Sequence, residues 1–245
     1  LAQREFFSPY HRGYKSDATI EAITKGIEMG ALLGKHLQLH NEARVRVDNR
    51  LLSGKIDNSR LAHAGYGIES IFNQIHVDAY KKANIHLSLD GSGSMSGAKW
   101  NATVQMTMAI VKAVSYTQNI SVQVSIRVTD DHDNPVTLYV YNSKKNKINH
   151  IKKAFESFYP NYLTPEGMCF EAMIKKNKLI ASSKDMQSYF INISDGAPGA
   201  GSYCGSHAVS HTKRQVDKLR NELGMQVISF YIDGSETNYE ALQRR

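Results

Sequence analysis

Hydrophobic residues recur at helical spacing in the first part of the chain. In residues 17–40 apolar residues lie three or four positions apart, and Asp17 stands where a helix N-cap is expected, so this segment predicts an amphipathic helix. Residues 42–57 fit either a short strand or a helix, and residues 58–78 predict a short helix followed by an extended segment. Residues 1–16 are polar and aromatic without a clear period and are expected to form an arm.

From residue 85 onward the pattern changes to strands that alternate with helices. Hydrophobic runs predict buried strands, and two alternating segments separated by the turn 130–134 predict a hairpin. The strands are expected at residues 85–90, 121–129, 135–142, 187–194 and 225–233. The helices are expected at residues 98–118, 147–157, 166–180 and 208–223. This alternation predicts an α/β fold, a doubly wound, mostly parallel sheet flanked by helices.

The change of pattern also predicts how the chain is divided. Residues 1–84 are expected to form an N-terminal arm and helical extension that packs on the main domain, and residues 85–245 to form that domain. The chain begins without methionine, and residues 238–245 have the pattern of a helix start. We therefore expect the sequence to be a piece of a longer chain.

The net charge of +7 raises the question of nucleic-acid binding. The densest basic runs are residues 142–153 and 174–179, and both fit helix or loop surface. No set of aromatic residues interleaves with them, as single-strand binding would require. A solvated surface or contact with an acidic protein is therefore favoured, with nucleic acid as the weaker alternative.

The cysteines and the hydropathy of the chain indicate where in the cell the protein is expected. Two cysteines, Cys169 and Cys204, do not make a disulfide framework in a chain of 245 residues and are expected to be reduced, which favours a cytoplasmic location. No apolar stretch approaches the roughly 20 residues that span a bilayer, so no membrane partner is expected.

A turn rich in glycine and serine follows the strand expected at residues 85–90. A phosphate loop would need glycine where Ser92 stands, and Lys-Ser or Lys-Thr directly after Gly97, where the chain instead has Ala-Lys-Trp. A dinucleotide-binding fingerprint would need a third glycine where Ser96 stands. Both kinds of phosphate site are therefore disfavoured.

A nucleophilic serine is disfavoured as well. A nucleophile elbow would place serine between Gly93 and Gly97, where the chain has Met95. His207 and His211 follow the strand that ends near residue 194 and could in principle activate a serine, but surface histidines are the simpler interpretation.

The pattern that fits is Asp-x-Ser-x-Ser, at Asp90, Ser92 and Ser94. Alternate residues of a tight turn can direct one carboxylate and two hydroxyls into the same space, and such hard oxygen ligands suit Mg²⁺ or Mn²⁺. Thr164 and Asp195 lie on loops that this topology brings to the same rim. The segment 130–135 resembles a calcium loop superficially, but it lacks the required glycine and terminal glutamate and is expected to be a hairpin turn.

With these residues in order, the segment 85–245 resembles a von Willebrand factor A (VWA) domain. The resemblance implies a metal-ion-dependent adhesion site formed by Asp90, Ser92, Ser94, Thr164 and Asp195. It implies that the serines bind the ion directly, that the aspartates bind directly or through water, and that Thr164 joins in one conformational state. In this family an acidic residue of a protein partner commonly completes the coordination of the ion.

Flanking segments narrow the resemblance to the intracellular bacterial and phage branch of VWA proteins. The segments LLSGKIDNSRLAHA, LTPEG and ISDGAP are most similar to the T subunit of aerobic cobaltochelatase. In that branch the domain works with a ring-forming AAA+ ATPase of the MoxR type. The resemblance therefore implies a non-catalytic adaptor that docks such a motor onto a client in the cytoplasm.

Two alternatives stay open at this point. The first is a cobaltochelatase subunit, part of an ATP-dependent complex that inserts cobalt into a corrin ring, although the long acidic region that precedes the domain in that subunit does not stand in this chain. The second is a phage or virion structural or adhesion protein that uses the same fold, located in the host cytoplasm or the virion.

Overall fold

The computed structural model describes residues 3–5, 16–41, 44–78, 82–161, 163–196 and 198–232. The helix start expected at 238–245 and most of the arm expected at 1–16 lie outside these residues. Whether the chain divides at residues 84 and 85 stays a prediction.

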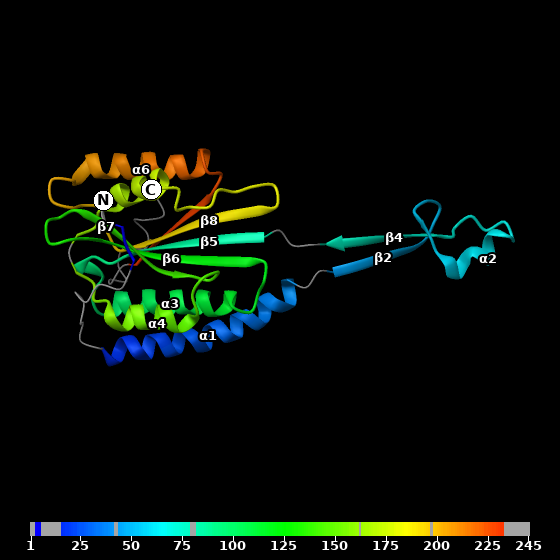
Figure 1. The fold of residues 1–245 in the computed structure, drawn as a ribbon, viewed down its shortest axis with the longest axis horizontal. Helices are drawn as coiled ribbons and strands as arrows, with labels where there is room; N and C mark the ends of the chain where they lie inside the picture. Colours follow the sequence, from blue (N-terminus) through cyan, green and yellow to red (C-terminus); the bar gives the residue numbers. More distant parts are fainter. Residues whose placement is uncertain are drawn as a thin grey trace, which may run out of the picture.

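A six-stranded sheet forms the centre of the molecule, with the order β1-β7-β6-β5-β8-β9 (Figure 1). Its strands are β1 (Gln3–Glu5), β5 (Lys82–Asp90), β6 (Ile120–Thr129), β7 (Pro135–Asn142), β8 (Met186–Ser194) and β9 (Gln226–Tyr231). All neighbouring strands are parallel except β6 and β7, which form an antiparallel hairpin. The predicted fold class, a doubly wound and mostly parallel α/β sheet, is confirmed.

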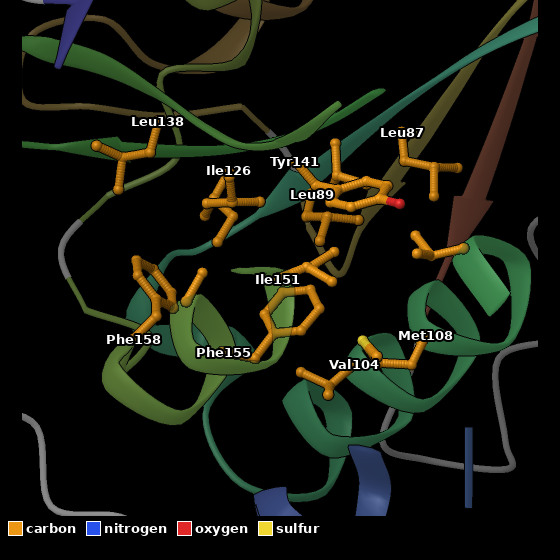
Figure 2. Close-up of a cluster of buried hydrophobic side chains, with 14 of the residues drawn as sticks. Leu87, Leu89, Val104, Met108, Ile126, Leu138, Tyr141, Ile151, Phe155 and Phe158 are labelled. Atoms are coloured by element: carbon orange, nitrogen blue, oxygen red, sulfur yellow. The ribbon is translucent and has the colours of Figure 1, made fainter. Parts of the chain in front are cut away.

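Helices cover both faces of this sheet (Figure 1). One face carries α1 (Asp17–Asn41), α3 (Ala98–Val114) and α4 (Ile148–Ser157), and the other carries α5 (Glu166–Lys175) and α6 (Gly205–Asn221). Side chains alternate along β5, so Leu87 and Leu89 enter the core beneath α3 and α4, where they meet Val104 and Phe155 (Figure 2). A second core lies under α5 and α6 and contains Phe170, Met173, Phe190 and Leu219.

Helix α1 packs along α3 because three glycines repeat every fourth residue on its inner side. A Cβ added to Gly26 would come within 3 Å of the Gln105 carbonyl oxygen, and one added to Gly30 would come as close to the carbonyl oxygen of Ala109. Gly34 would meet the ring of Tyr116 in the same way. The backbone of α1 therefore lies directly on α3, the helix that follows the glycine-serine turn.

A long hairpin projects from the end of the sheet at which β5 begins (Figure 1). It contains β2 (Arg44–Leu51), β3 (Lys55–Ile56), η1 (Asn58–Arg60), α2 (Leu61–Ala64) and β4 (Phe72–Asp78), with the strand order β2-β4-β3. The segment whose pattern fitted either a strand or a helix is thus strand. The short helix and the following extended segment predicted at residues 58–78 are confirmed.

Local hydrogen bonds explain where predicted and observed helix ends differ. Helix α5 ends at Lys175 because Asn177 takes a left-handed conformation, with φ at 50°, and its N–H bonds to the carbonyl of Ile174. Helix α3 ends at Val114, where the hydroxyls of Ser115 and Thr117 donate to carbonyls of the last turn.

The turn between β6 and β7 is stabilised by its own aspartate. The Asp130 carboxylate accepts hydrogen bonds from the N–H groups of Asn134 and His132, at 2.9 and 3.0 Å, and these bonds, chiefly that from Asn134, lower the pKa of the carboxyl group. The hairpin turn predicted in place of a calcium loop is therefore confirmed. β1, which pairs in parallel with β7, was not predicted, because a three-residue polar strand at a sheet edge has no periodic signal.

Candidate metal centre

The predicted site residues lie at the point where the strand order reverses. β5 has β6 on one side and β8 on the other, and the chain leaves β5 and β8 toward opposite faces of the sheet. Such a switch point opens a crevice at the carboxyl ends of the two strands. Asp90 is the last residue of β5, and Asp195 directly follows Ser194, the last residue of β8.

Asp90 is fully buried and is held from two sides. Its Oδ1 accepts the backbone N–H of Ser92 at 3.0 Å, and its Oδ2 accepts the Ser194 hydroxyl at 2.6 Å. Residue 91 must be glycine because a Cβ there would come within 3 Å of side chains of Ile126 and Phe158. Close packing under the turn, rather than an unusual backbone angle, therefore requires this glycine.

Hydroxyl groups connect this turn to the second aspartate. The hydroxyl oxygens of Ser92 and Ser94 lie 3.0 Å apart, and the Ser94 hydroxyl donates to Asp195 Oδ1 at 2.8 Å. These two residues are 101 positions apart in the chain. The fold thus brings Asp90, Ser92, Ser94 and Asp195 into one continuous hydrogen-bonded group.

Thr164 is bonded through its backbone to the loop that follows Asp195. It is buried, and its N–H and carbonyl pair with the carbonyl and N–H of Gly199, both at 2.9 Å. This bridge attaches the loop before α5 to the loop that carries Asp195. Among the hydrogen bonds of the described residues, none joins the Thr164 hydroxyl to the other four side chains. Whether all five residues bind a metal stays a prediction.

One residue at the site was not predicted from the sequence. The ammonium group of Lys99, in the first turn of α3, lies 2.6 Å from Asp195 Oδ2. The Asp195 side chain is 2% exposed and that of Lys99 is 27% exposed, so the ammonium covers the carboxylate from the solvent side. The only sequence signal was a basic residue five positions beyond Ser94, which no motif requires.

A buried polar network lies below the Thr164 loop and was also missed. Arg127 is fully buried on β6, and its Nη1 donates to the Ser88 hydroxyl at 2.7 Å and to Asn192 Oδ1 at 2.6 Å. Glu166, two residues beyond Thr164, accepts from Asn192 Nδ2 at 2.6 Å and forms an ion pair with Arg127 at 3.4 Å. The network therefore ties the start of α5 to three strands of the sheet.

Of the two histidines considered as activating bases, His207 lies edge-on to the ring of Tyr203, with centroids 5.9 Å apart, and His211 is hydrogen-bonded. His211 bonds through Nδ1 to the Tyr203 hydroxyl and through Nε2 to Gln215, both at 3.0 Å, and faces Glu171 at 3.5 Å. No hydrogen bond between described residues joins it to a serine of the glycine-serine turn. The geometry therefore gives no support to a nucleophilic serine.

Both cysteines are free thiols. Cys169 is buried in the second core, and burial raises the pKa of its thiol to about 11, so it stays protonated at neutral pH. No helix within the described residues is both long and apolar enough to cross a membrane.

The donor set has a definite chemical preference. In the part of the chain that the structure describes, no three His, Cys, Asp or Glu side chains gather as a metal-binding group, so a zinc-type ligand set is not found there. The two carboxylates and the serine hydroxyls of the turn are hard oxygen donors, which fit Mg²⁺ or Mn²⁺. The residues present therefore fit the predicted ion by chemistry.

Comparison with known proteins gives distant structural similarities only. No protein-family model matches the sequence, and no curated protein matches it. The manganese-loaded TRAP protein of Plasmodium vivax is 10% identical, over 80% of this chain and 64% of that one, with a TM-score of 0.48. The vWF domain of the type V pili tip protein Mfa5 from Porphyromonas gingivalis is 12% identical, over 48% and 39%, with a TM-score of 0.35.

The pilus adhesin SpaC from Lactobacillus rhamnosus GG, in its open conformation, is 13% identical over 51% of this chain and 17% of that one, with a TM-score of 0.37. The chain thus spans less than two thirds of each of these proteins. TM-scores below 0.5 do not establish a shared fold, so strand order and side-chain contacts remain the basis for judging the chain.

Proposed function

We propose that this chain is a VWA-type protein-interaction domain whose binding to a partner depends on Mg²⁺ or Mn²⁺. The observation that carries the proposal is the hydrogen-bonded group at the switch point, in which Ser94 joins the Asp90 turn to Asp195 across two strands. Five oxygen-bearing residues would hold the ion, namely Asp90, Ser92, Ser94, Thr164 and Asp195.

The charge of the site explains why an acidic partner is proposed. When bound, the ion would supply a positive centre that accepts one more oxygen ligand. Asp90 and Asp195 bring only two formal negative charges, and the serines bring none. If these aspartates bind through water, only neutral hydroxyls touch the ion directly, and a carboxylate from another protein is then a suitable anionic oxygen ligand for its open position.

The protein's own residues position and shield the site. The Ser194 hydroxyl and the Ser92 N–H both bond to the Asp90 carboxylate and hold it in one orientation. The Thr164–Gly199 bridge lets a displacement of one loop move the other. Partner binding at the rim would therefore act on the start of α5 as well.

The resemblance of the sequence adds finer proposals about the partner. The partner class is a ring-forming AAA+ ATPase of the MoxR type, in the cytoplasm, and the chain acts as a non-catalytic adaptor. A cobaltochelatase subunit and a virion structural or adhesion protein are the alternatives, and nucleic acid is a weaker one through the basic surface. Capture from native extract, with and without Mg²⁺, separates these partners by what is retained.

The test of the metal site is a titration of Mn²⁺ into the whole chain. Binding is measured by calorimetry and by the electron paramagnetic resonance signal of free Mn²⁺. We expect saturable binding of one ion that Mg²⁺ displaces and that Ser94→Ala weakens by about tenfold or more, since a direct ligand is lost. The matched control is Ser210→Ala, at an exposed serine on α6. Equal affinities in Ser94→Ala and the unaltered chain would contradict the proposal.

A further inference from the structure

Lys99 makes a contact at the candidate metal centre that none of the five proposed ligands explains. Asp195 has two carboxylate oxygens, and both are engaged. Oδ1 accepts the Ser94 hydroxyl at 2.8 Å, and Oδ2 lies 2.6 Å from the Lys99 ammonium. The Lys99 ammonium therefore contacts a carboxylate oxygen that a metal ion at this site would use.

The position of Lys99 allows the ammonium to move while the backbone of α3 stays in place. Lys99 belongs to the first turn of α3, and its carbonyl accepts the Thr103 hydroxyl at 2.9 Å, so its backbone is fixed within the helix. Its side chain is a quarter exposed, and a lysine stem can rotate to bring its charged end into water. Movement of this side chain would make Asp195 Oδ2 accessible.

The Asp195 carboxylate, by contrast, cannot leave. Its side chain is almost completely buried, and an unpaired buried carboxylate is costly. A cation beside Asp195 is therefore favourable, and it can be either the ammonium of Lys99 or an ion from solution. The two cations repel each other at contact distance, so they exclude one another from this oxygen.

We propose that the Lys99 ammonium competes with the divalent cation for Asp195. It stabilises the site when no ion is bound, and it sets how tightly a metal ion binds there. This inference rests on the proposed metal-binding function. Binding of the ion displaces the Lys99 side chain toward solvent, and release of the ion allows the ion pair to form again. The energy of the ion pair opposes metal binding, so removing the ammonium tightens it.

The experiment compares the Mn²⁺ affinity of whole-chain variants at neutral pH and low ionic strength. Lys99→Gln should bind Mn²⁺ about tenfold or more tightly than the unaltered chain, because couplings of close charge pairs reach this size. Lys99→Arg keeps the positive charge and should stay within about threefold of the unaltered chain. The matched control is Lys153→Gln, which removes the same charge from an exposed position on α4 and should change little.

Thermal unfolding gives a second readout that does not depend on the affinity fit. Without added metal, Lys99→Gln should unfold at a lower temperature than the unaltered chain, because buried Asp195 loses its counter-charge. With saturating Mn²⁺ this difference should disappear. If Lys99→Gln does not fold, Lys99→Met, which keeps most of the aliphatic stem, takes its place in both measurements.

The outcomes separate this inference from the function on which it rests. If the unaltered chain and Lys99→Gln bind Mn²⁺ equally, and Ser94→Ala binds it weakly, Lys99 is no competitor but the metal site stands. If none of the variants binds Mn²⁺, both proposals are overturned. Tighter binding by Lys99→Gln than by the unaltered chain, with weak binding by Ser94→Ala, would support both proposals.

Discussion

Arg127 and Glu166 form an ion pair inside the protein, 39 positions apart in the chain, with Nη2 and Oε1 separated by 3.4 Å. Neither side chain is exposed by more than 7%. Asn192 bonds to both partners, so the guanidinium and the carboxylate share one amide between them. Because Glu166 follows Thr164 by two residues, this pair anchors the loop that approaches the candidate metal centre.

Removing the carboxylate of this pair should destabilise the whole domain. Glu166→Ala leaves the Arg127 guanidinium buried without its counter-charge, which costs about 3–5 kcal/mol in comparable pairs. Urea unfolding followed by circular dichroism would measure the loss. Glu222→Ala, at an exposed glutamate after α6, is the control and should stay within about 0.5 kcal/mol. A loss of less than about 1 kcal/mol in Glu166→Ala would show that the pair is not a structural anchor.

Stability should fall on acidification because of a second buried group, His86. Its ring stacks on Phe190 with centroids 5.3 Å apart and bonds to the Ser125 hydroxyl at 2.9 Å. Burial, with a smaller contribution from the positive charge of Arg127, lowers the pKa of His86 from 6.5 to about 4. The unfolded chain therefore binds a proton near pH 6.5, whereas the folded chain does not until about pH 4.

Between these two values the free energy of unfolding decreases as the pH decreases. The expected contribution of His86 is a loss of about 2 kcal/mol between about pH 7 and about pH 5, measured by urea unfolding at each pH. His86→Gln keeps a polar group near Ser125 but does not titrate, so its unfolding free energy should depend less on pH by that amount. An unchanged pH dependence in this variant would contradict the assignment.

Contact between α1 and α3 should be sensitive to a single methyl group. Gly30→Ala places a Cβ against the Ala109 carbonyl oxygen and should lower the free energy of unfolding by about 1–3 kcal/mol, the usual cost of overpacking. Helix propensity alone predicts the opposite sign, a gain of about 1 kcal/mol from glycine to alanine. Thermal unfolding therefore distinguishes the two effects by sign.

The control for this prediction is Gly65→Ala in the projecting hairpin. A Cβ at Gly65 would meet only the Ala62 carbonyl oxygen, at 3.4 Å, and its φ of −66° suits alanine. The change should be close to neutral. A stabilised Gly30→Ala variant would show that α1 does not lie directly on α3 in solution.

The order of strands and helices could be predicted from local patterns, because burial on one face or both faces of an element repeats every two or every 3.6 residues. The glycine-serine turn could also be recognised from the sequence, because Asp90, Ser92 and Ser94 are close together in the chain. The placement of Asp195 beside that turn followed from the topology of a doubly wound sheet, and the Ser94–Asp195 hydrogen bond agrees with it.

Side-chain partners that come from distant segments were not predictable. Lys99 meets Asp195 across 96 positions, and Arg127 meets Glu166 across 39, without any spacing rule that links them. The glycines of α1 likewise could not be explained from the sequence, because the close contact that requires them is made with α3 and Tyr116. The sequence by itself determined most of the elements and the candidate oxygen donors, because these depend on local periodicity and side-chain chemistry. Only the tertiary structure decided which charges neutralise those donors, because close packing brings together groups that the chain keeps far apart.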